Sequence, residues 1–192
     1  MATVARVNQA PRRHRIKAAI GILVVVGIAA IATWILADLG RRREIESIVD
    51  SPAGLLALFI LSALSSATLL LPVPGIALTV VAASVANPIL VGLTAGLGQA
   101  IGELTGYMAG SSGGALVRDR LAAGALAGWM RRRGTVTVFV LSVVPNPAFD
   151  VAGMLAGALG LPLPRFLLAT AAGKVVRNVV IAVTVVHGDA LL

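Results

Sequence analysis

Long runs without a charged residue dominate the chain after residue 17. The run from Ala18 to Ala37 contains 20 uncharged residues, which is the length that a helix needs to cross about 30 Å of hydrocarbon. From Ser51 to Gly102 there are 52 uncharged residues, and one helix of that length would extend over roughly 78 Å. The pattern therefore predicts a helical membrane protein whose second apolar run folds back at least once.

Prolines divide the longer run, because a proline lacks the backbone donor that a helix interior requires. The turn Pro72-Val73-Pro74-Gly75 and the break at Asn87-Pro88 predict spanning helices over Ala53–Leu71 and Pro88–Gly110. The piece between them, Gly75–Ala86, has 12 residues. It is too short to cross, so we predict a re-entrant segment. An ordinary interfacial loop between two spans is the alternative.

The second half of the chain repeats this arrangement. Val144-Pro145-Asn146-Pro147 follows Leu71-Pro72-Val73-Pro74 by 73 residues, and each is followed by a small-residue apolar piece and another proline break. After the second break, Arg165–Val186 is predicted to span the membrane. The repeat predicts two re-entrant hairpins that enter from opposite faces. Their turns are expected at Pro72, Pro74, Pro145 and Pro147.

The predicted organisation has three parts. Residues 1–17 are predicted to form a basic tail of the cytoplasmic type, and residues 18–50 an additional N-terminal transmembrane anchor with a charged connector. Residues 51–192 form a membrane domain whose repeated units are residues 51–110 and 134–187. The predicted fold class is all-α integral membrane, with about four transmembrane helices and two inverted re-entrant helical hairpins.

The segment between the two units, Gly113–Arg133, carries several arginines and Trp129. We predict an interfacial amphipathic helix here, because arginine and tryptophan favour the headgroup region. A solvated loop is the alternative.

Composition and charge agree with a membrane protein. The chain is 58% hydrophobic and 12% charged, whereas an ordinary soluble domain carries about 25% charged residues. The net charge of +8 comes mainly from clusters that flank apolar runs. We therefore expect membrane lipids as partners, with anionic headgroups at the arginine clusters. Nucleic acid is not expected, since no aromatic-rich or helix-turn-helix context accompanies the arginines. We expect a multi-pass protein of the cell (plasma) membrane, and a homo-oligomer is left open.

Four ionisable residues are surrounded by apolar runs on both sides: Glu103, Asp150, Lys174 and Arg177. A charge at the bilayer centre costs at least about 2.5–3.5 kcal/mol, so these side chains should face the protein interior and pair. Counted from the centres of their predicted spans, Glu103 and Lys174 differ in depth by roughly 3 Å. Arg177 lies on the same helix face as Lys174. A pair between Glu103 and either cation is therefore expected, as a structural ion pair or as part of ligand or proton handling.

Two further features concern local roles. Asp150 follows the second Pro-x-Pro turn by three residues, so it either caps the re-entrant helix or binds a cation or a proton. The helix of Glu103 carries a glycine at every fourth position, which is typical of a face for close helix packing. These glycines are Gly98, Gly102, Gly106 and Gly110.

The sequence does not favour an enzyme. Its two histidines are isolated near the chain ends and it has no cysteine, so neither a metal site nor a Ser-His-Asp set is expected. No phosphate-binding loop or dinucleotide fingerprint is present. No cofactor is expected.

Residues 98–110, GQAIGELTGYMAG, resemble the glycine-rich motif of the DedA, or VTT-domain (SNARE-associated Golgi protein), superfamily. The run from Pro145 through Asp150, Gly153, residues 155–157 (LAG) and Phe166 to residues 173–177 (GKVVR) is similar to the small YqaA-like branch. The resemblance covers about residues 60–187. It implies two facing re-entrant hairpins.

The resemblance also implies a role in moving lipids. Bacterial relatives are linked to returning undecaprenyl phosphate across the membrane, and eukaryotic relatives scramble phospholipids. Where the main DedA pattern has arginines on either side of the second Pro-x-Pro turn, this chain has Ser142 and Ala148. A lipid phosphate would therefore have to be bound by Lys174 and Arg177, with Glu103 and Asp150 as counter-charges or proton carriers, or the substrate is another one.

Overall fold

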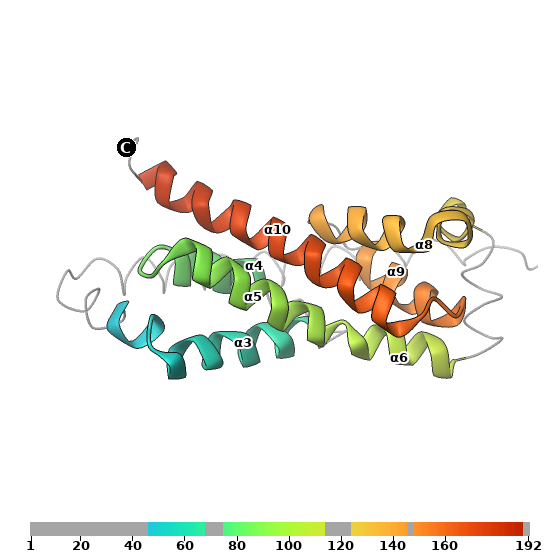
Figure 1. Ribbon diagram of the computed structural model, residues 1–192, viewed down its shortest axis with the longest axis horizontal. Coiled ribbons are helices and arrows are strands. Elements are labelled where there is room, and N and C mark those ends of the chain that lie inside the picture. The colour runs from blue at the N-terminus through green and yellow to red at the C-terminus, as the bar shows by residue number, and fades with distance from the viewer. Residues whose placement is uncertain (1–45, 68–74, 114–123, 146–147, 190–192) are drawn as a thin grey trace, which may run out of the picture.

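The computed structural model describes residues 46–67, 75–113, 124–145 and 148–189, and its elements are helices (Figure 1). The helices are α3 (Pro52–Ala67), α4 (Gly75–Ala83), α5 (Pro88–Gly102), α6 (Leu104–Ser112), α8 (Ala125–Val143), α9 (Ala148–Ala158) and α10 (Leu163–Asp189). Helices α5 and α6 follow one another along the length of the bundle, and α10 crosses them (Figure 1).

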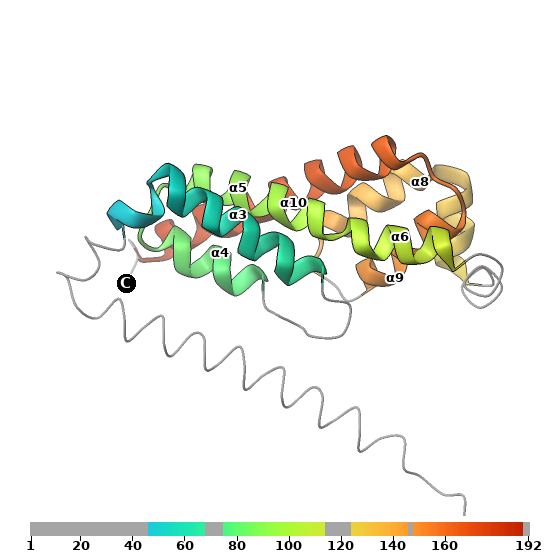
Figure 2. The same cartoon turned by 90° about the horizontal axis from the view of Figure 1, so that it is seen from below.

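The bundle has two halves, which the two views of the ribbon show side by side (Figures 1 and 2). Helices α3 and α4 lie against α5 in one half, whereas α8 and α9 lie with α6 and the beginning of α10 in the other. Each half has an apolar core. Buried members of the first core are Leu58, Ala82, Ala83, Val91, Ala95 and Ala182. Those of the second core are Ala127, Met130, Val138, Phe149, Ala152, Leu155, Ala156, Phe166 and Ala169.

Local sequence signals set two helix ends. The Asn87 side chain accepts hydrogen bonds from the backbone N–H groups of Ile89 and Leu90, at 3.0 and 3.2 Å, and so caps α5, whose first residue is Pro88. At the end of α9, Gly160 has a φ of 71°. Leu161 N–H donates to the carbonyl of Ala156 there, which is the Schellman arrangement that a left-handed glycine permits.

Two helices depart from the sequence prediction. The predicted Pro88–Gly110 helix is formed as α5 and α6, which join at Glu103 with near-helical backbone angles (φ −67°, ψ −12°). Arg133 has non-helical angles (φ −143°, ψ 54°), so it kinks α8. The predicted interfacial helix Gly113–Arg133 is therefore helical from Ala125 up to this kink, while residues 114–123 lie outside the described part.

Within the described residues, two helices are long and apolar enough to cross a membrane, Pro88–Ser112 and Leu163–His187. The predicted span Ala53–Leu71 is only partly described, and its helix α3 has 16 residues. The predicted anchor Ala18–Ala37 lies outside the described residues. The expected four transmembrane helices and the two re-entrant hairpins are thus not confirmed. For the described residues, an all-helical structure with two apolar helices of spanning length is confirmed.

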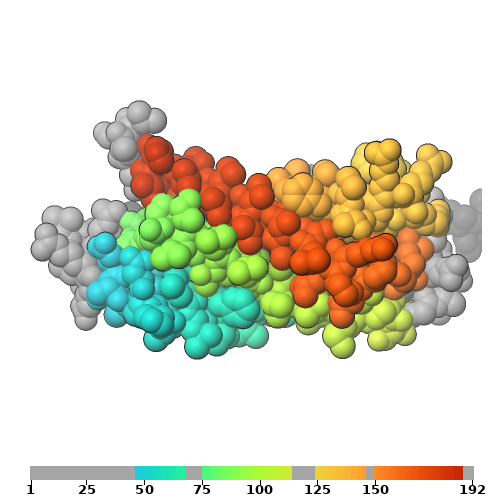
Figure 3. All heavy atoms as spheres, in the orientation of Figure 1, coloured from blue at the N-terminus to red at the C-terminus, as the bar shows by residue number. Residues whose placement is uncertain are grey.

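Large apolar side chains also cover much of the outer surface. Leu56, Leu64, Leu168 and Val180 are each more than half exposed. In the space-filling view, α10 crosses this face diagonally between the α3–α5 side and α8 (Figure 3). An outer surface of this kind suits hydrocarbon rather than water as the solvent, because apolar patches of such extent are rare on soluble monomers.

Candidate functional site

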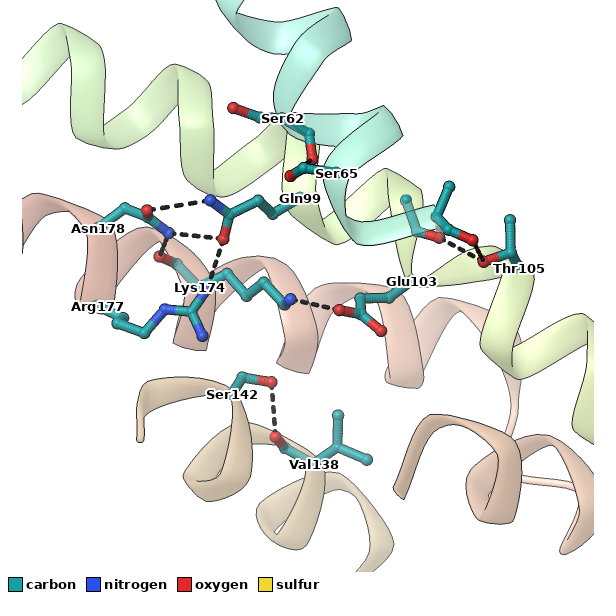
Figure 4. A network of polar contacts seen from close by, with 12 residues as sticks. Ser62, Ser65, Gln99, Glu103, Thr105, Val138, Ser142, Lys174, Arg177 and Asn178 are labelled. Atoms are coloured by element: carbon teal, nitrogen blue, oxygen red, sulfur yellow. Dashed lines mark hydrogen bonds and ion pairs between the residues drawn. The ribbon is translucent and has the colours of Figure 1, made fainter. Parts of the chain in front are cut away.

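The crossing of α5 and α10 contains a cluster of polar side chains in an otherwise apolar bundle (Figure 4). We call Gln99, Glu103, Lys174, Arg177 and Asn178 the polar cluster. The Lys174 ammonium forms an ion pair with the Glu103 carboxylate. Glu103 and Lys174 are only 5% and 4% exposed. The pairing that the depth count predicted is therefore present.

The amide side chains of the cluster bind one another. The Asn178 amide nitrogen donates to the Gln99 side-chain oxygen at 3.1 Å, and the Gln99 amide nitrogen donates to the Asn178 oxygen at 3.2 Å. Thr79 on α4 donates its hydroxyl to the same Asn178 oxygen at 2.7 Å. A third helix is thereby joined to the crossing.

Residues of the polar cluster occupy corresponding positions in the two halves of the chain. A shift of 75 residues relates Gln99 to Lys174 and Glu103 to Asn178. The Gln99–Asn178 contact and the Glu103–Lys174 contact therefore occupy equivalent positions of the two halves. The proline turns repeat after 73 residues and these side chains after 75, so the second half of the chain also repeats the pairing between α5 and α10 at a nearby offset.

The same spacing relates two glycine contacts. A methyl group on Gly98 would meet the carbonyl oxygen of Phe59 and the Cβ of Ser62 on α3. A methyl group on Gly173 would meet the carbonyl oxygen of Phe139 and the Cβ of Ser142 on α8. The two halves thus pack α3 on α5 and α8 on α10 through equivalent residues.

Arg177 is the member of the cluster with an unused donor. It is half-buried and donates from Nη2 to the side-chain oxygen of Gln99. Its Nε has no hydrogen-bond partner among the described residues. A guanidinium group has five donors in a fixed fork that matches a phosphate or carboxylate, so Arg177 can still bind an anionic group.

Asp150 lies apart from the hydrogen-bonded cluster. It is in the first turn of α9 and is exposed. Its charge acts on Lys174, whose ammonium also lies 4.9 Å from the centre of the Phe149 ring. Of the prolines of the predicted re-entrant turns, Pro145 follows α8 and is exposed, whereas Pro72, Pro74 and Pro147 lie outside the described residues.

Comparison with known proteins places the chain in a family. Residues 73–187 match the family model described as the VTT domain. The chain belongs to the VTT-domain family. The matched region contains the whole polar cluster, and α3 lies before it.

Two curated relatives of this VTT-domain protein come from Arabidopsis thaliana. It is 52% identical to Vacuole membrane protein KMS1 over 40 residues, which are 21% of this chain and 10% of the relative. It is 33% identical to Vacuole membrane protein KMS2 over 100 residues, with 42% of this chain and 24% of the relative covered. The chain thus matches about a quarter or less of these relatives' length. No solved structure matches.

The glycines of the VTT-domain motif lie at helix contacts. A methyl group on Gly102 would meet the Ala63 carbonyl oxygen of α3, and one on Gly110 would meet the Met154 carbonyl oxygen of α9. Gly106 is buried. The predicted packing face is therefore used by two different helices, α3 for Gly98 and Gly102 and α9 for Gly110.

Sequence reasoning missed the neutral part of the site. Gln99 and Asn178 each lie one helical turn from a charged member of the cluster, and this spacing was a usable signal. Thr79 gave no such signal, because an isolated threonine in an apolar helix commonly bonds its own backbone. Ser142, which stands where the DedA pattern has an arginine, is buried and donates to the Val138 carbonyl at 2.7 Å. It is not available to a ligand.

Replacing Asn178 by leucine should destabilise this VTT-domain protein. The change leaves the buried Gln99 amide nitrogen without its acceptor, which costs about 1–3 kcal/mol, whereas the Thr79 hydroxyl keeps its bond to the Gly75 carbonyl. The measurement is the thermal unfolding of the purified protein in detergent. Thr184→Val is the control, because Thr184 is exposed and donates only to its own helix at Val180. Equal unfolding temperatures for the two variants would show that the amide contacts do not stabilise the crossing.

Proposed function

We propose that this protein moves lipids across the membrane, as a transporter or scramblase, and that the headgroup passes the polar cluster while the acyl chains stay in the lipid. The observation that carries the proposal is the position of the cluster. Lys174 lies next to the middle of the span Leu163–His187, and Gln99 next to the middle of Pro88–Ser112. Charged side chains at this depth are costly and commonly mark substrate paths.

Individual roles follow from the contacts. Arg177 is half-buried whereas Lys174 is only 4% exposed, so we assign to Arg177 the first contact with a headgroup phosphate. Lys174 is held by Glu103, and it would bind the phosphate by exchanging that partner for the ligand. Asp150, which is exposed beside this pair, would be a further counter-charge or proton carrier.

A fluorescent-lipid assay in liposomes tests this proposal. Purified full-length protein should accelerate the movement of a headgroup-labelled phospholipid to the outer leaflet, where dithionite quenches it. Arg177→Ala should reduce the rate about tenfold, the effect expected for one lost charge-assisted hydrogen bond, and Arg177→Lys should retain part of it. His187→Ala is the control, because His187 is an exposed polar residue at the far end of the same helix.

The result can also favour the two other function classes. Wild-type liposomes that quench no faster than empty ones would rule out lipid movement. If the variant without the Arg177 side chain still complements a deletion, the protein is better explained as a membrane scaffold for envelope integrity. Ion flux without lipid flux would indicate a small ion or metabolite transporter. A multi-pass location in the cell membrane is part of the proposal.

A further inference from the structure

A second polar feature lies at the end of the bundle where α10 begins. A pocket of about 500 Å³ opens there between the kink of α8 and the turn from α9 to α10. Its lining includes residues 130–136 on one side and residues 159–162 with Arg165 on the other. This pocket, which we call the arginine pocket, shares no residue with the polar cluster.

Four arginines line the arginine pocket: Arg131, Arg132, Arg133 and Arg165. The first three are consecutive, and the non-helical backbone of Arg133 changes the chain direction there. In the part of the chain that the structure describes, no carboxylate pairs with Arg132, Arg133 or Arg165. Three uncompensated guanidinium groups around one hollow repel one another, and the repulsion is relieved when an anion with several oxygens binds between them.

An apolar groove adjoins the arginine pocket. It has a volume of about 290 Å³ and is lined by Trp129, Val136, Val140 and Leu141 together with Arg132, Arg133 and Thr137. Arg132, Arg133 and Val136 border both hollows. Trp129 is 67% exposed and Val140 50% exposed. A cationic hollow and an apolar groove therefore form one continuous surface, whose chemistry changes from one end to the other.

The arginine pocket lies at one end of a helix of spanning length, where lipid headgroups are expected. Leu163 is the first residue of the spanning helix Leu163–His187, so Pro162 and Arg165 lie at the level of the membrane surface. Lipid phosphates lie at this level, and arginine and tryptophan are enriched there. The apolar groove extends from Trp129, before the kink of α8, to Val140 and Leu141 after it, and it passes Arg132 and Arg133 on the way.

We propose that this surface binds one anionic phospholipid. Its phosphate is held by Arg132, Arg133 and Arg165, and one acyl chain lies in the groove along Val136 and Val140. This site is separate from the polar cluster. It holds a resident lipid between the kink of α8 and the turn from α9 to α10, and it does not depend on lipid transport by the cluster.

The test compares phosphatidylglycerol with phosphatidylcholine, added to the full-length protein in a neutral detergent. Phosphatidylglycerol should raise the unfolding temperature more than phosphatidylcholine does, because a ligand that binds the folded state stabilises it. Arg132→Gln with Arg165→Gln should weaken its binding by about tenfold or more. Val140→Trp, which fills the groove, should also weaken it. Arg12→Gln with Arg13→Gln removes the same charge from the basic N-terminal tail, so it measures the general attraction between the charge of the protein and the lipid and should weaken binding much less.

Several outcomes would overturn the proposal. These are equal effects of the two lipids, unchanged phosphatidylglycerol binding in either pocket variant, or an equal loss in the N-terminal control. An arginine-dependent effect of inorganic phosphate as large as that of the lipid would identify a site for free phosphate instead. The side chains substituted in the two pocket variants, Arg132, Arg165 and Val140, are exposed, and circular dichroism verifies the fold.

Arg177→Ala separates this proposal from the proposed function, because it leaves the Glu103–Lys174 ion pair in place. This variant should still bind phosphatidylglycerol as the wild type does, whatever its effect on lipid flux. Lost binding in this variant would show that the lipid occupies the polar cluster and not the arginine pocket.

Discussion

Lys174→Met is expected to lower the free energy of unfolding by about 3–5 kcal/mol, because it leaves the Glu103 carboxylate buried without its partner. Glu103→Gln should also destabilise, since it leaves the ammonium group unpaired. The double variant Glu103→Gln, Lys174→Met should be more stable than Lys174→Met alone. Two neutral side chains of similar size carry no unpaired charge into the bundle.

Thermal unfolding of all four proteins in detergent measures this prediction as a double-mutant cycle, which isolates the interaction between the two side chains. A Lys174→Met variant that unfolds at the wild-type temperature would mean that the pair does not stabilise the crossing. If the double variant is stable but moves no lipid, the pair has a function beyond holding α5 to α10.

The second large effect is expected at the glycine contacts. Gly102→Leu and Gly110→Leu should each destabilise the protein by about 1–3 kcal/mol or more, because the added Cβ alone would overlap a backbone carbonyl of the neighbouring helix. Neither backbone can yield without separating α5 from α3 or α6 from α9. The fraction of protein that remains monodisperse after extraction and heating measures the effect.

Gly128→Leu is the matched control for these substitutions. Gly128 is also inside a helix, but a Cβ added there would have no atom within 4 Å. It should therefore cost little. If all three leucine variants lose the same amount of folded protein, the loss comes from the substitution itself and the close helix contacts are not its cause.

Much of the helical plan could be predicted because it depends on a few strong local signals. The charge-free lengths and the prolines predicted helices near α3, α4, α5 and α10, although only two of them are confirmed as long enough to span. A pair between Glu103 and either Lys174 or Arg177 could be predicted from depth and helix face, since a helix rises by a fixed distance per residue, and the structure has the pair with Lys174. An unpaired charge inside the bilayer is costly, so both side chains were expected to form a pair.

The kink of α8, the neutral side chains of the site and two further glycine contacts could not be predicted from the positions of charged residues and prolines. The kink at Arg133 has no proline at its position, and Gly134, which follows it, does not by itself predict a kink. Gln99, Asn178 and Thr79 are neutral, and their contact joins three helices. Gly92 and Gly96, which would meet Val179 and Val175 of α10 if they carried a Cβ, fall outside the four-residue glycine series. Pairings of this kind depend on which helices meet, and the pattern of one helix does not contain that information.

Passage of a lipid headgroup along the polar cluster can be detected by photo-crosslinking. A phospholipid with a photoreactive diazirine in its headgroup is illuminated during flux in liposomes, and the labelled peptides are identified. We expect labelling around Gln99–Glu103 and Lys174–Asn178, and less of it in Arg177→Ala. Labelling confined to outward-facing residues such as Leu168 and Val180, with lipid flux intact, would contradict it.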